Sequence, residues 1–475
     1  SDLRISYGAS AATPPDYPAV NENRALTSLT QSTQQLWPLV DNNRKIAYEE
    51  RVRPLREAAA SKLLHARYSR WQLRELMLDF WQNHFNVHAG DAAIAVAIPE
   101  FDRELRRLAL GNFQELLSYV SMSTPMLIYL NNRSSRTGAP NENFARELFE
   151  LHTLGRPHYL NDLYSRWREV PGAPQGRPTG YIDQDVYEAA RAFTGWMVED
   201  GRGLGSGVNL PNTGKFAYVE SWHDPYQKRV LAQEFEPFQA PMSDGKRVLE
   251  LLSQHPGTAK FICEKLLRRF VDDEPPSELV ESAAKVWLTN TKSPQQIARV
   301  LEHILTNKAV QSGIESGKYK KLKRPLELAM SFMRKLDLDV APSQGLVNQL
   351  SNAGQRLYYW PTPDGHPDVS SYWLTSHAMR QRWFVPVGLM DNWWGTGFVS
   401  NEQLAKGVAK PLSQDRMLDF VAATLLGEAG KEALKKIVQI QAPMNAGLMS
   451  PTNEEWSGVR RTIAYLAMSP AFQWK

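Results

Sequence analysis

The sequence lacks several features that would each identify a class of protein. Its single cysteine, Cys263, excludes an internal disulfide and a zinc module built from several cysteines. No run of about 18 apolar residues occurs, so no segment is predicted to span a membrane. The 55 basic and 51 acidic side chains leave a net charge of only +4 over 475 residues. A balance this even does not indicate a nucleic-acid-binding protein.

Common catalytic signatures are also missing. The sequence has no glycine-rich phosphate-binding loop, no dinucleotide-binding fingerprint and no nucleophile elbow. Its composition is that of a globular protein, with 42% apolar residues and 14 tryptophans, and the chain is long enough to bury a sizeable core. The function must therefore be sought in less common motifs.

Helical periodicity runs through most of the chain. Apolar residues recur at helical spacing from about residue 26 to 154, as with Leu73, Leu76 and Phe80. Within this stretch separate helices are predicted at about 99–110 and at 113–130. An alternating run at 215–219 predicts one hairpin strand. The same kind of pattern resumes at Asp244. The sequence therefore predicts a mainly α, multi-helix globular domain with long ordered loops and at most a small β-hairpin.

Proline and glycine mark the predicted boundaries. Residues 1–25 are rich in Pro, Ala and Ser and are predicted to form an extended N-terminal arm. The chain begins without methionine, as expected for a trimmed or processed protein. Residues 26–475 are predicted to form a single helical domain. Two loop regions interrupt this domain, a Pro-rich insert at 156–180 and a loop region at 200–245.

One helical segment, NENFARELFELHTLG, concentrates acidic side chains. On a regular helix three of its carboxylates share a face and can bind a hard or borderline cation: Glu142, Glu147 and Glu150. His152 lies roughly opposite and joins them only if the helix ends near Glu150. Glu142, Arg146 and Glu150 are also spaced as a salt-bridge ladder on a solvated helix, and the spacing alone favours the ladder.

Two histidine motifs are further candidates. His84 and His88 have the i, i+4 spacing of paired imidazole ligands, although a structural role is commoner for such a pair. His223 and Asp224 are neighbours in the second loop region, where they can bind a metal or orient an acid–base imidazole. The alternative is a turn before Pro225.

An aromatic segment follows near the middle of the C-terminal half. The sequence WPTPDGHPD, residues 360–368, predicts a rigid loop because of its prolines and glycine. Together with Trp373 its aromatic side chains are suited to line a carbohydrate or peptide cleft. Packing in the core is the alternative for each single tryptophan.

Taken together, these segments resemble the domain-of-unknown-function 1800 family of bacterial, mostly exported proteins. The resemblance covers almost the whole chain after about residue 45. It rests on FWQNHF, LGNFQELL, STPMLIYLNN, NENFARELFELHTLG, DVYEAARAFTGW, the His223–Asp224 pair, WPTPDGHPD and SPAFQ. The long insert at 156–180 departs from the short link usual in the family.

The resemblance implies a location and a set of polar positions rather than a reaction. It predicts a periplasmic or extracellular protein, which works beside a secreted protein similar to phosphatases and sulfatases. The family's polar motif positions correspond here to His84, Asn141, Glu142, Arg146, Glu147, Glu150, His152, His223 and Asp224. So many polar positions favour a buried polar centre over a surface ladder, either as a metal site or as a structural network.

The first functional hypothesis is a metal-dependent enzyme, a hydrolase or an oxidoreductase, with a Glu/His centre. Glu142 is its predicted general base, Arg146 holds that base or binds an anionic group of the substrate, and Asp224 is a third catalytic residue. The predicted ligands of a divalent metal ion (Mn, Fe, Zn or Ca) are His84, Glu147, Glu150, His152 and His223.

Two alternatives remain open from the sequence. The first is a non-catalytic scaffold or binding partner of the secreted phosphatase- or sulfatase-like protein. In that case the acidic motif is an ion network and the aromatic loop around Trp360 is the contact surface. The second is a metal-free glycosidase that uses a pair of carboxylates.

Overall fold

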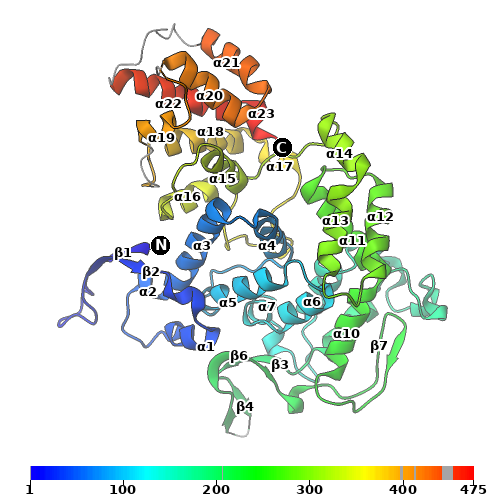
Figure 1. The fold of residues 1–475 in the computed structure, drawn as a ribbon. Helices are drawn as coiled ribbons and strands as arrows, with labels where there is room; N and C mark the ends of the chain where they lie inside the picture. The colour runs from blue at the N-terminus through cyan, green and yellow to red at the C-terminus, as the bar shows by residue number, and fades with distance from the viewer. Residues whose placement is uncertain (1, 206, 396–399, 411–412, 441–452) are drawn as a thin grey trace.

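The computed structural model describes residues 2–205, 207–395, 400–410, 413–440 and 453–475. Within these ranges it contains 23 α-helices and eight short strands (Figure 1). The prediction of a mainly α fold is confirmed.

Helices of the N-terminal two thirds build the larger part of the molecule, which occupies the lower half of Figure 1 and extends up its right-hand side. These helices are α1 (Thr33–Leu36), α2 (Tyr48–Arg51), α3 (Arg53–Tyr68), α4 (Gln72–His84), α5 (Ala92–Leu108), α6 (Phe113–Met122), α7 (Thr124–Tyr129), α8 (Glu142–Glu147), α9 (Asp183–Ala192), α10 (Ser243–Gln254), α11 (Pro256–Phe270), α12 (Ser277–Thr289), α13 (Gln296–Thr306) and α14 (Lys308–Glu315). Their apolar faces meet in one large core, in which Trp81, Trp196 and Trp287 are fully buried.

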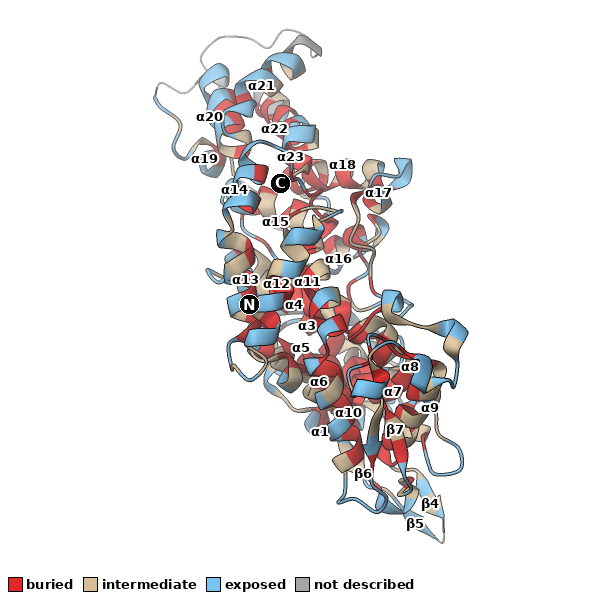
Figure 2. Cartoon of the chain, turned by 90° about the vertical axis from the view of Figure 1, so that its right-hand side faces the viewer, coloured by how far each residue is buried: buried red, intermediate tan, exposed pale blue. Residues whose placement is uncertain are grey.

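The remaining helices form a second, smaller core in the upper half of Figure 1. They are α15 (Pro325–Lys335), α16 (Gln344–Asn352), α17 (Ser370–Trp373), α18 (Ser376–Met390), α19 (Asn401–Ala405), α20 (Gln414–Leu426), α21 (Ala429–Ile440), α22 (Asn453–Met468) and α23 (Pro470–Gln473). The two cores meet at α3, because this helix packs on α5 on one side and on α15 on the other. Figure 2 shows buried residues running through both parts.

The strands form four separate two-stranded antiparallel sheets in the described residues. They are β1 (Asp2–Tyr7) with β2 (Val20–Ala25), β3 (Trp196–Asp200) with β6 (Asn212–Tyr218), β4 (Gly203–Gly205) with β5 (Val208–Asn209), and β7 (Lys228–Val230) with β8 (Gln233–Phe235). One hairpin at most was expected. The predicted arm at 1–25 pairs with itself from Asp2↔Ala25 to Tyr7↔Val20, and the loop region at 200–245 pairs its backbone in the same way.

Two details of the helix pattern differ from expectation. A helix was expected to begin at Pro99, but α5 begins seven residues earlier behind the Asp91 cap, and Pro99 lies inside it. Residues 92–98 are almost all apolar and buried, so they show no alternation that a pattern could reveal. One helix was expected over 113–130, and it is interrupted at Ser123 before the Thr-Pro that opens α7.

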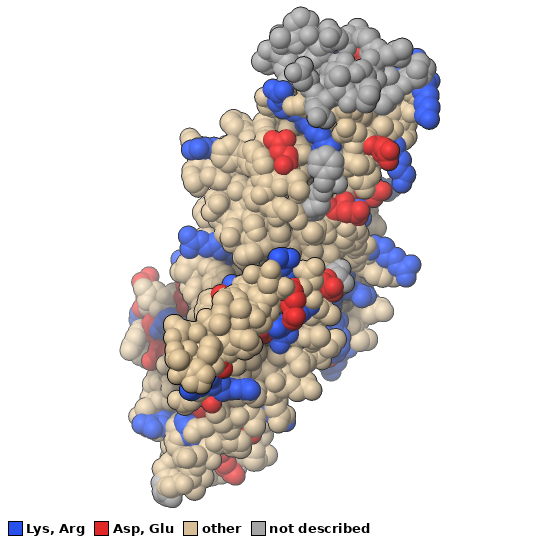
Figure 3. Space-filling view, turned by 90° about the vertical axis from the view of Figure 1, so that its left-hand side faces the viewer, with Lys and Arg blue, Asp and Glu red and all other residues tan. Residues whose placement is uncertain are grey.

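No helix in the described residues is both long enough and apolar enough to cross a membrane. On the face shown in Figure 3, basic and acidic side chains are interspersed over the surface. That face therefore presents no single large basic patch.

Candidate functional site

Three segments that are far apart in the sequence line one cavity of about 260 Å³, namely the end of α4, the middle of α11 and the WPTPDGHPD loop. The segment after α8 contacts this lining through His152, which lies against His84. The cavity is lined by Phe80, Asn83, His84, Lys265, Arg268, Asp364, Gly365, His366, Pro367, Asp368 and Val369. We call it the Lys265 cavity.

His84, the last residue of α4, is held from both sides of its ring. Its Nε2 lies 3.1 Å from the carbonyl oxygen of His152, and its Nδ1 lies 3.0 Å from Nζ of Lys265. Because a carbonyl only accepts, Nε2 carries the hydrogen, and Nδ1 offers its lone pair to the lysine. Burial and the nearby charge of Lys265 keep the pKa of His84 well below its usual value.

Lys265 projects from α11 toward His84. Burial lowers the pKa of its amine to about 8, against the opposing effect of Asp368 and with the support of Arg268. At neutral pH an appreciable fraction of this amine is therefore uncharged. A neutral lysine is a base and a nucleophile, so Lys265 is the most reactive group of the cavity.

The NENFARELFELHTLG segment positions His152 through an unusual helical turn. Helix α8 ends at Glu147, and residues Leu148–His152 form a wider π-helical turn, a feature often found at functional sites. The turn brings the His152 ring to 5.9 Å from the His84 ring, measured between centroids. Burial lowers the pKa of His152 to about 3, and its Nε2 is buried without a hydrogen-bond partner.

Asp364 and Asp368 line the cavity, whereas Glu147 and Glu150 are not among its lining residues. Burial raises the pKa of Glu147, and the negative charges of Glu150 and Asp364 raise it further. Glu150 itself forms an ion pair with the exposed Arg156. Asp364 is exposed, and it accepts a hydrogen bond of 2.6 Å from the Thr362 hydroxyl. The cavity thus combines a lysine whose pKa is lowered with the carboxylate of Asp364 in its lining.

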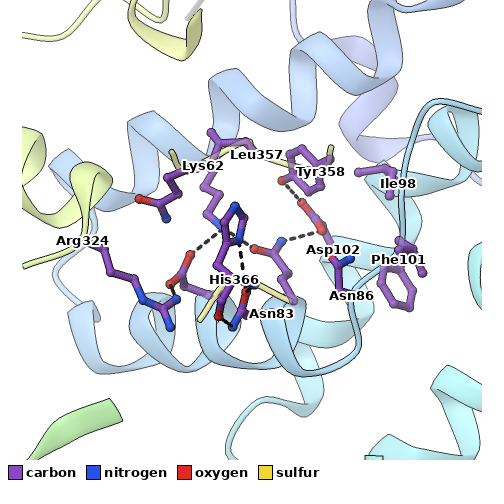
Figure 4. Close-up of a pocket in the computed structure, with 14 residues that line it drawn as sticks. Lys62, Asn83, Asn86, Ile98, Phe101, Asp102, Arg324, Leu357, Tyr358 and His366 are labelled. Carbon is purple, nitrogen blue, oxygen red and sulfur yellow. Dashed lines mark hydrogen bonds and ion pairs between the residues drawn. The ribbon is translucent and has the colours of Figure 1, made fainter. Parts of the chain in front are cut away.

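The WPTPDGHPD loop is fixed on α4 by backbone and side-chain contacts. The amide of Asn83 accepts from the backbone of His366 at 2.7 Å and donates to its carbonyl at 3.0 Å (Figure 4). Asn86 donates to the carbonyls of Trp360 and Thr362. This contact between FWQNHF and WPTPDGHPD explains why both motifs are needed to build one wall of the cavity.

Gly365 is the point of closest approach in this loop, and its replacement by alanine provides a test. A Cβ atom there would lie 2.1 Å from the carbonyl oxygen of Asn83, and the φ of Gly365 is +72°. Gly138, with a φ of +75° and nothing within 4 Å, is the matched control. We expect Gly138→Ala to lower the free energy of unfolding by about 1 kcal/mol and Gly365→Ala to lower it by about 2 kcal/mol more, measured by urea denaturation. Equal losses would contradict close packing of the loop on α4.

Beneath the cavity lies a buried ion network that the sequence analysis did not find. Asp79 of α4 lies 2.8 Å from Lys62, 3.2 Å from Arg269 and 3.5 Å from Arg324. Arg324 in turn lies 3.0 Å from Asp368 of the loop. The three cations hold the pKa of Asp79 well below its usual value despite its burial. The network thus ties α3, α4, α11 and α15 to the loop.

A small polar pocket of about 40 Å³ adjoins this network (Figure 4). Gln82 and Tyr358 both donate to Asp102, the glutamine at 2.6 Å. Burial raises the pKa of Asp102, although these two donors oppose the rise. The polar side chains that line this pocket hydrogen-bond to one another. We therefore interpret the pocket as a structural feature rather than as a second cleft.

Glu142 and Arg146 do not belong to the Lys265 cavity lining. Arg146 lies 3.2 Å from Glu142 and 3.2 Å from Asp183 of α9, and both Glu142 and Arg146 are partly exposed. Of the two ion pairs of the predicted ladder, Glu142–Arg146 forms. The second does not, because Glu150 pairs with Arg156 and not with Arg146. These contacts join α8 to α9.

His223 and Asp224 lie in another network, around α9 and β7. Asp224 receives two hydrogen bonds from Arg191, of 2.8 and 3.0 Å. His223 approaches Thr194 through Nδ1 and Asp244 through Nε2, at 3.0 and 3.3 Å. Every polar atom named here has a partner within the protein, which is typical of a structural junction.

The structure consequently does not assemble the predicted metal-ligand set. In the part of the chain that it describes, no three His, Cys, Asp or Glu side chains form a group able to hold a metal ion. His84 and His152 are neighbours, but both ring nitrogens of His84 are already engaged. The five residues separate into three places, namely His84 with His152, Glu147 with Glu150, and His223.

Sequence reasoning missed Lys265, which is the central residue of the cavity. A single lysine in an amphipathic helix carries no local signal, because its partner His84 lies 181 residues away. Asp364 was part of a recognised motif but was not singled out. Only the assembled fold reveals that these residues share a site.

The comparisons with known proteins identify a family and nothing further. No curated protein and no solved structure gives a significant match. A family model described as "Protein of unknown function (DUF1800)" matches residues 3–474. Because the match spans essentially the whole chain, this protein belongs to the DUF1800 family.

Proposed function

We propose that this protein is an enzyme that uses general acid–base chemistry, a hydrolase, with its active site in the Lys265 cavity. The observation that carries the proposal is the hydrogen bond between Lys265 and His84 at the wall of a cavity lined by three distant segments. A buried amine in contact with a neutral imidazole is uncommon as a purely structural pair, because each partner loses solvation and no ion pair is gained.

The chemistry follows from the protonation states. The neutral amine of Lys265 accepts a proton from a water molecule or attacks the substrate directly. His84 accepts a hydrogen bond from the amine of Lys265. This contact fixes the orientation of the amine and so the direction of the amine's lone pair. When water is the nucleophile, Lys265 returns the proton that it accepted to the leaving group. The carboxylate pair of the predicted glycosidase has its nearest counterpart in Glu147 and Asp364, so glycosides belong among the substrates to test.

A metal is not part of this proposal, because the donor groups do not fit one. The predicted ligands are dispersed, and Glu150 is neutralised by Arg156. The predicted general base Glu142 is likewise held by Arg146 away from the cavity lining. A periplasmic or extracellular location, inferred from the family resemblance, remains part of the proposal.

The scaffold alternative is supported by one specific observation. Two residues predicted to be catalytic, Arg146 and Asp224, form ion pairs that join separate elements, and Glu142 pairs with Arg146 within α8. If the Lys265 cavity proves inactive, these ion pairs favour a binding partner of the secreted phosphatase- or sulfatase-like protein. Co-purification of the two proteins would then be the discriminating measurement.

The test is a screen of the purified protein against chromogenic esters, glycosides, and sulfate and phosphate esters, before and after treatment with EDTA. We expect one class to be hydrolysed, with a rate that chelation leaves within about twofold, and that Lys265→Met loses. Lys260→Met, a change on the same helix at a half-exposed lysine paired with Glu281, is the matched control. Loss of activity on chelation, or full activity in Lys265→Met, would overturn the proposal.

A further inference from the structure

A second cavity, of about 210 Å³, lies between α3 and α4 on one side and α15 on the other. Its exposed wall is overwhelmingly apolar, and the apolar groups come from Ala66, Leu76, Leu78, Leu326 and Met330. It is smaller than the roughly 300–1,000 Å³ of pockets that hold drug-sized ligands, so a small molecule is indicated.

Charged side chains border this cavity, five of them basic and three acidic. Most of these charges are already neutralised by ion pairs. Lys62 and Arg269 pair with Asp79, Arg269 and Lys475 pair with Glu327, and Glu75 pairs with Arg106. Each of the three acidic groups thus has a cation.

Two of the bordering cations, Lys323 and Arg334, have no carboxylate within 4.0 Å in the described part of the chain. Arg334 is exposed and donates to the carbonyls of Arg67 and Ser69. Lys323 differs because it is only 9% exposed. Its ammonium group donates to the carbonyl of Phe472 and lies 3.9 Å from the centroid of that ring.

A buried ammonium group without a counter-ion is energetically costly, and it is stabilised by any anion that reaches it. Burial lowers the pKa of Lys323 to about 8, with a smaller contribution from the charge of Lys335. The cavity beside it offers apolar walls rather than water-filled polar space. The ligand that satisfies both features has one negative group and an apolar tail.

We propose that this cavity binds a short- or medium-chain alkyl carboxylate, with its carboxylate group on the ammonium group of Lys323. The alkyl chain lies along α15, against Leu326 and Met330. The proposal is independent of the Lys265 cavity, because the two cavities share no lining residue. Arg334 lies eleven residues after Lys323, at the other end of α15. A single carboxylate group therefore does not reach both cations.

The test is a titration of the full chain with sodium octanoate, measured by isothermal titration calorimetry. We expect saturable one-to-one binding, at least tenfold weaker in Lys323→Met and changed less than threefold in Arg334→Met. Lys320→Met, a change of an exposed lysine outside the cavity, is the matched control and should bind as the wild type does. Octan-1-ol, which keeps the tail and lacks the charge, should bind at least tenfold more weakly than octanoate.

The proposal is overturned if octanoate does not bind at millimolar concentration, or if Lys323→Met binds it as well as the wild type does. A larger loss in Arg334→Met than in Lys323→Met would also overturn it, since the carboxylate would then lie at the other end of α15. If Lys323→Met does not fold, Lys323→Gln replaces it, and octanoate should then raise its Tm less than that of the wild type. Octanoate binding should be unchanged in Lys265→Met, so failure of either proposal is separable from failure of the other.

Discussion

Replacement of Asp79 by alanine is expected to lower the free energy of unfolding by about 3–5 kcal/mol. This carboxylate is buried and lies within 3.5 Å of three cations, from α3, α11 and the start of α15. Arg269 and Arg324 are themselves almost fully buried. Removing Asp79 leaves excess positive charge in the interior, and the loss of one partner from a buried pair costs far more than the net value of the pair.

Chemical denaturation of Asp79→Ala and of a matched surface variant measures this effect. Asp337 also pairs with an arginine, Arg67, but its side chain is 77% exposed. We expect Asp337→Ala to change stability by less than about 1 kcal/mol, because solvent screens the pair. A loss below about 1 kcal/mol in Asp79→Ala would show that Glu327 and Asp368 alone neutralise the buried arginines.

The contribution of Asp79 to stability is also expected to depend on pH. The pKa of Asp79 is lower in the folded protein than the value of about 3.9 in an unfolded chain. The unfolded state therefore binds more protons below about pH 4, and the contribution of Asp79 is present above that pH and lost as the pH falls through its folded pKa. The stability gap between wild type and Asp79→Ala should be constant from pH 5 to 7 and shrink below pH 4.

The sequence pattern predicted local structure well where one helix face is buried. Helix α4 lies where apolar spacing placed it, and the NENFARELFELHTLG segment begins as the expected helix. Strand β6 begins three residues before the strand predicted at 215–219 and ends one residue before its end. These successes share a cause, because amphipathic spacing reports which face meets the core. The same reasoning failed inside α5, where residues 93–99 are all buried and show no polar face.

The predicted metal centre shows where a helical wheel ceases to be reliable. The wheel assumed a regular helix through Glu150 and left His152 on the far side. The π-helical turn at Leu148–His152 changes the angle between successive side chains, so Glu147, Glu150 and His152 leave the arrangement that the wheel assigned. The spacing of apolar residues in this segment gave no sign of the turn.

The ion network and the Lys265 cavity were beyond sequence reasoning for a different reason. Asp79 meets Arg269 and Arg324 across 190 and 245 residues of chain. A pattern within one element contains no information on such partners. The family resemblance identified FWQNHF and WPTPDGHPD as motifs, and the structure adds that Asn83 of the first holds His366 of the second. Motifs far apart in sequence are thus best treated as parts of one site.

Replacement of Lys265 by methionine is expected to lower the rate of the hydrolytic reaction by about 10²–10⁴-fold, the usual contribution of a general base. With a pKa of about 8, about a tenth of this amine is neutral at pH 7, against less than about 0.1% of an ordinary lysine with a pKa near 10.4. The wild-type rate should therefore rise with pH up to about 8 and then level off. A rate that is independent of pH between 6 and 9 would contradict a role of Lys265 as base.

Stability provides a readout of Lys265 that needs no substrate. Its folded pKa of about 8 lies below the unfolded value near 10.4, so between these values the unfolded state binds more protons and stability rises with pH. From pH 8 to 10 the wild type should gain about 1–3 kcal/mol relative to Lys265→Met, with the lower part of the range expected because the lysine is partly exposed to the cavity. The variant also loses the hydrogen bond to His84, but this loss is the same at each pH and does not affect the change of stability with pH. Lys323, the other lysine whose pKa is lowered, is present in both proteins, so its titration cancels in the comparison. Parallel stability curves for the two proteins would mean that Lys265 is solvated like a surface lysine, and the cavity would then lose its base.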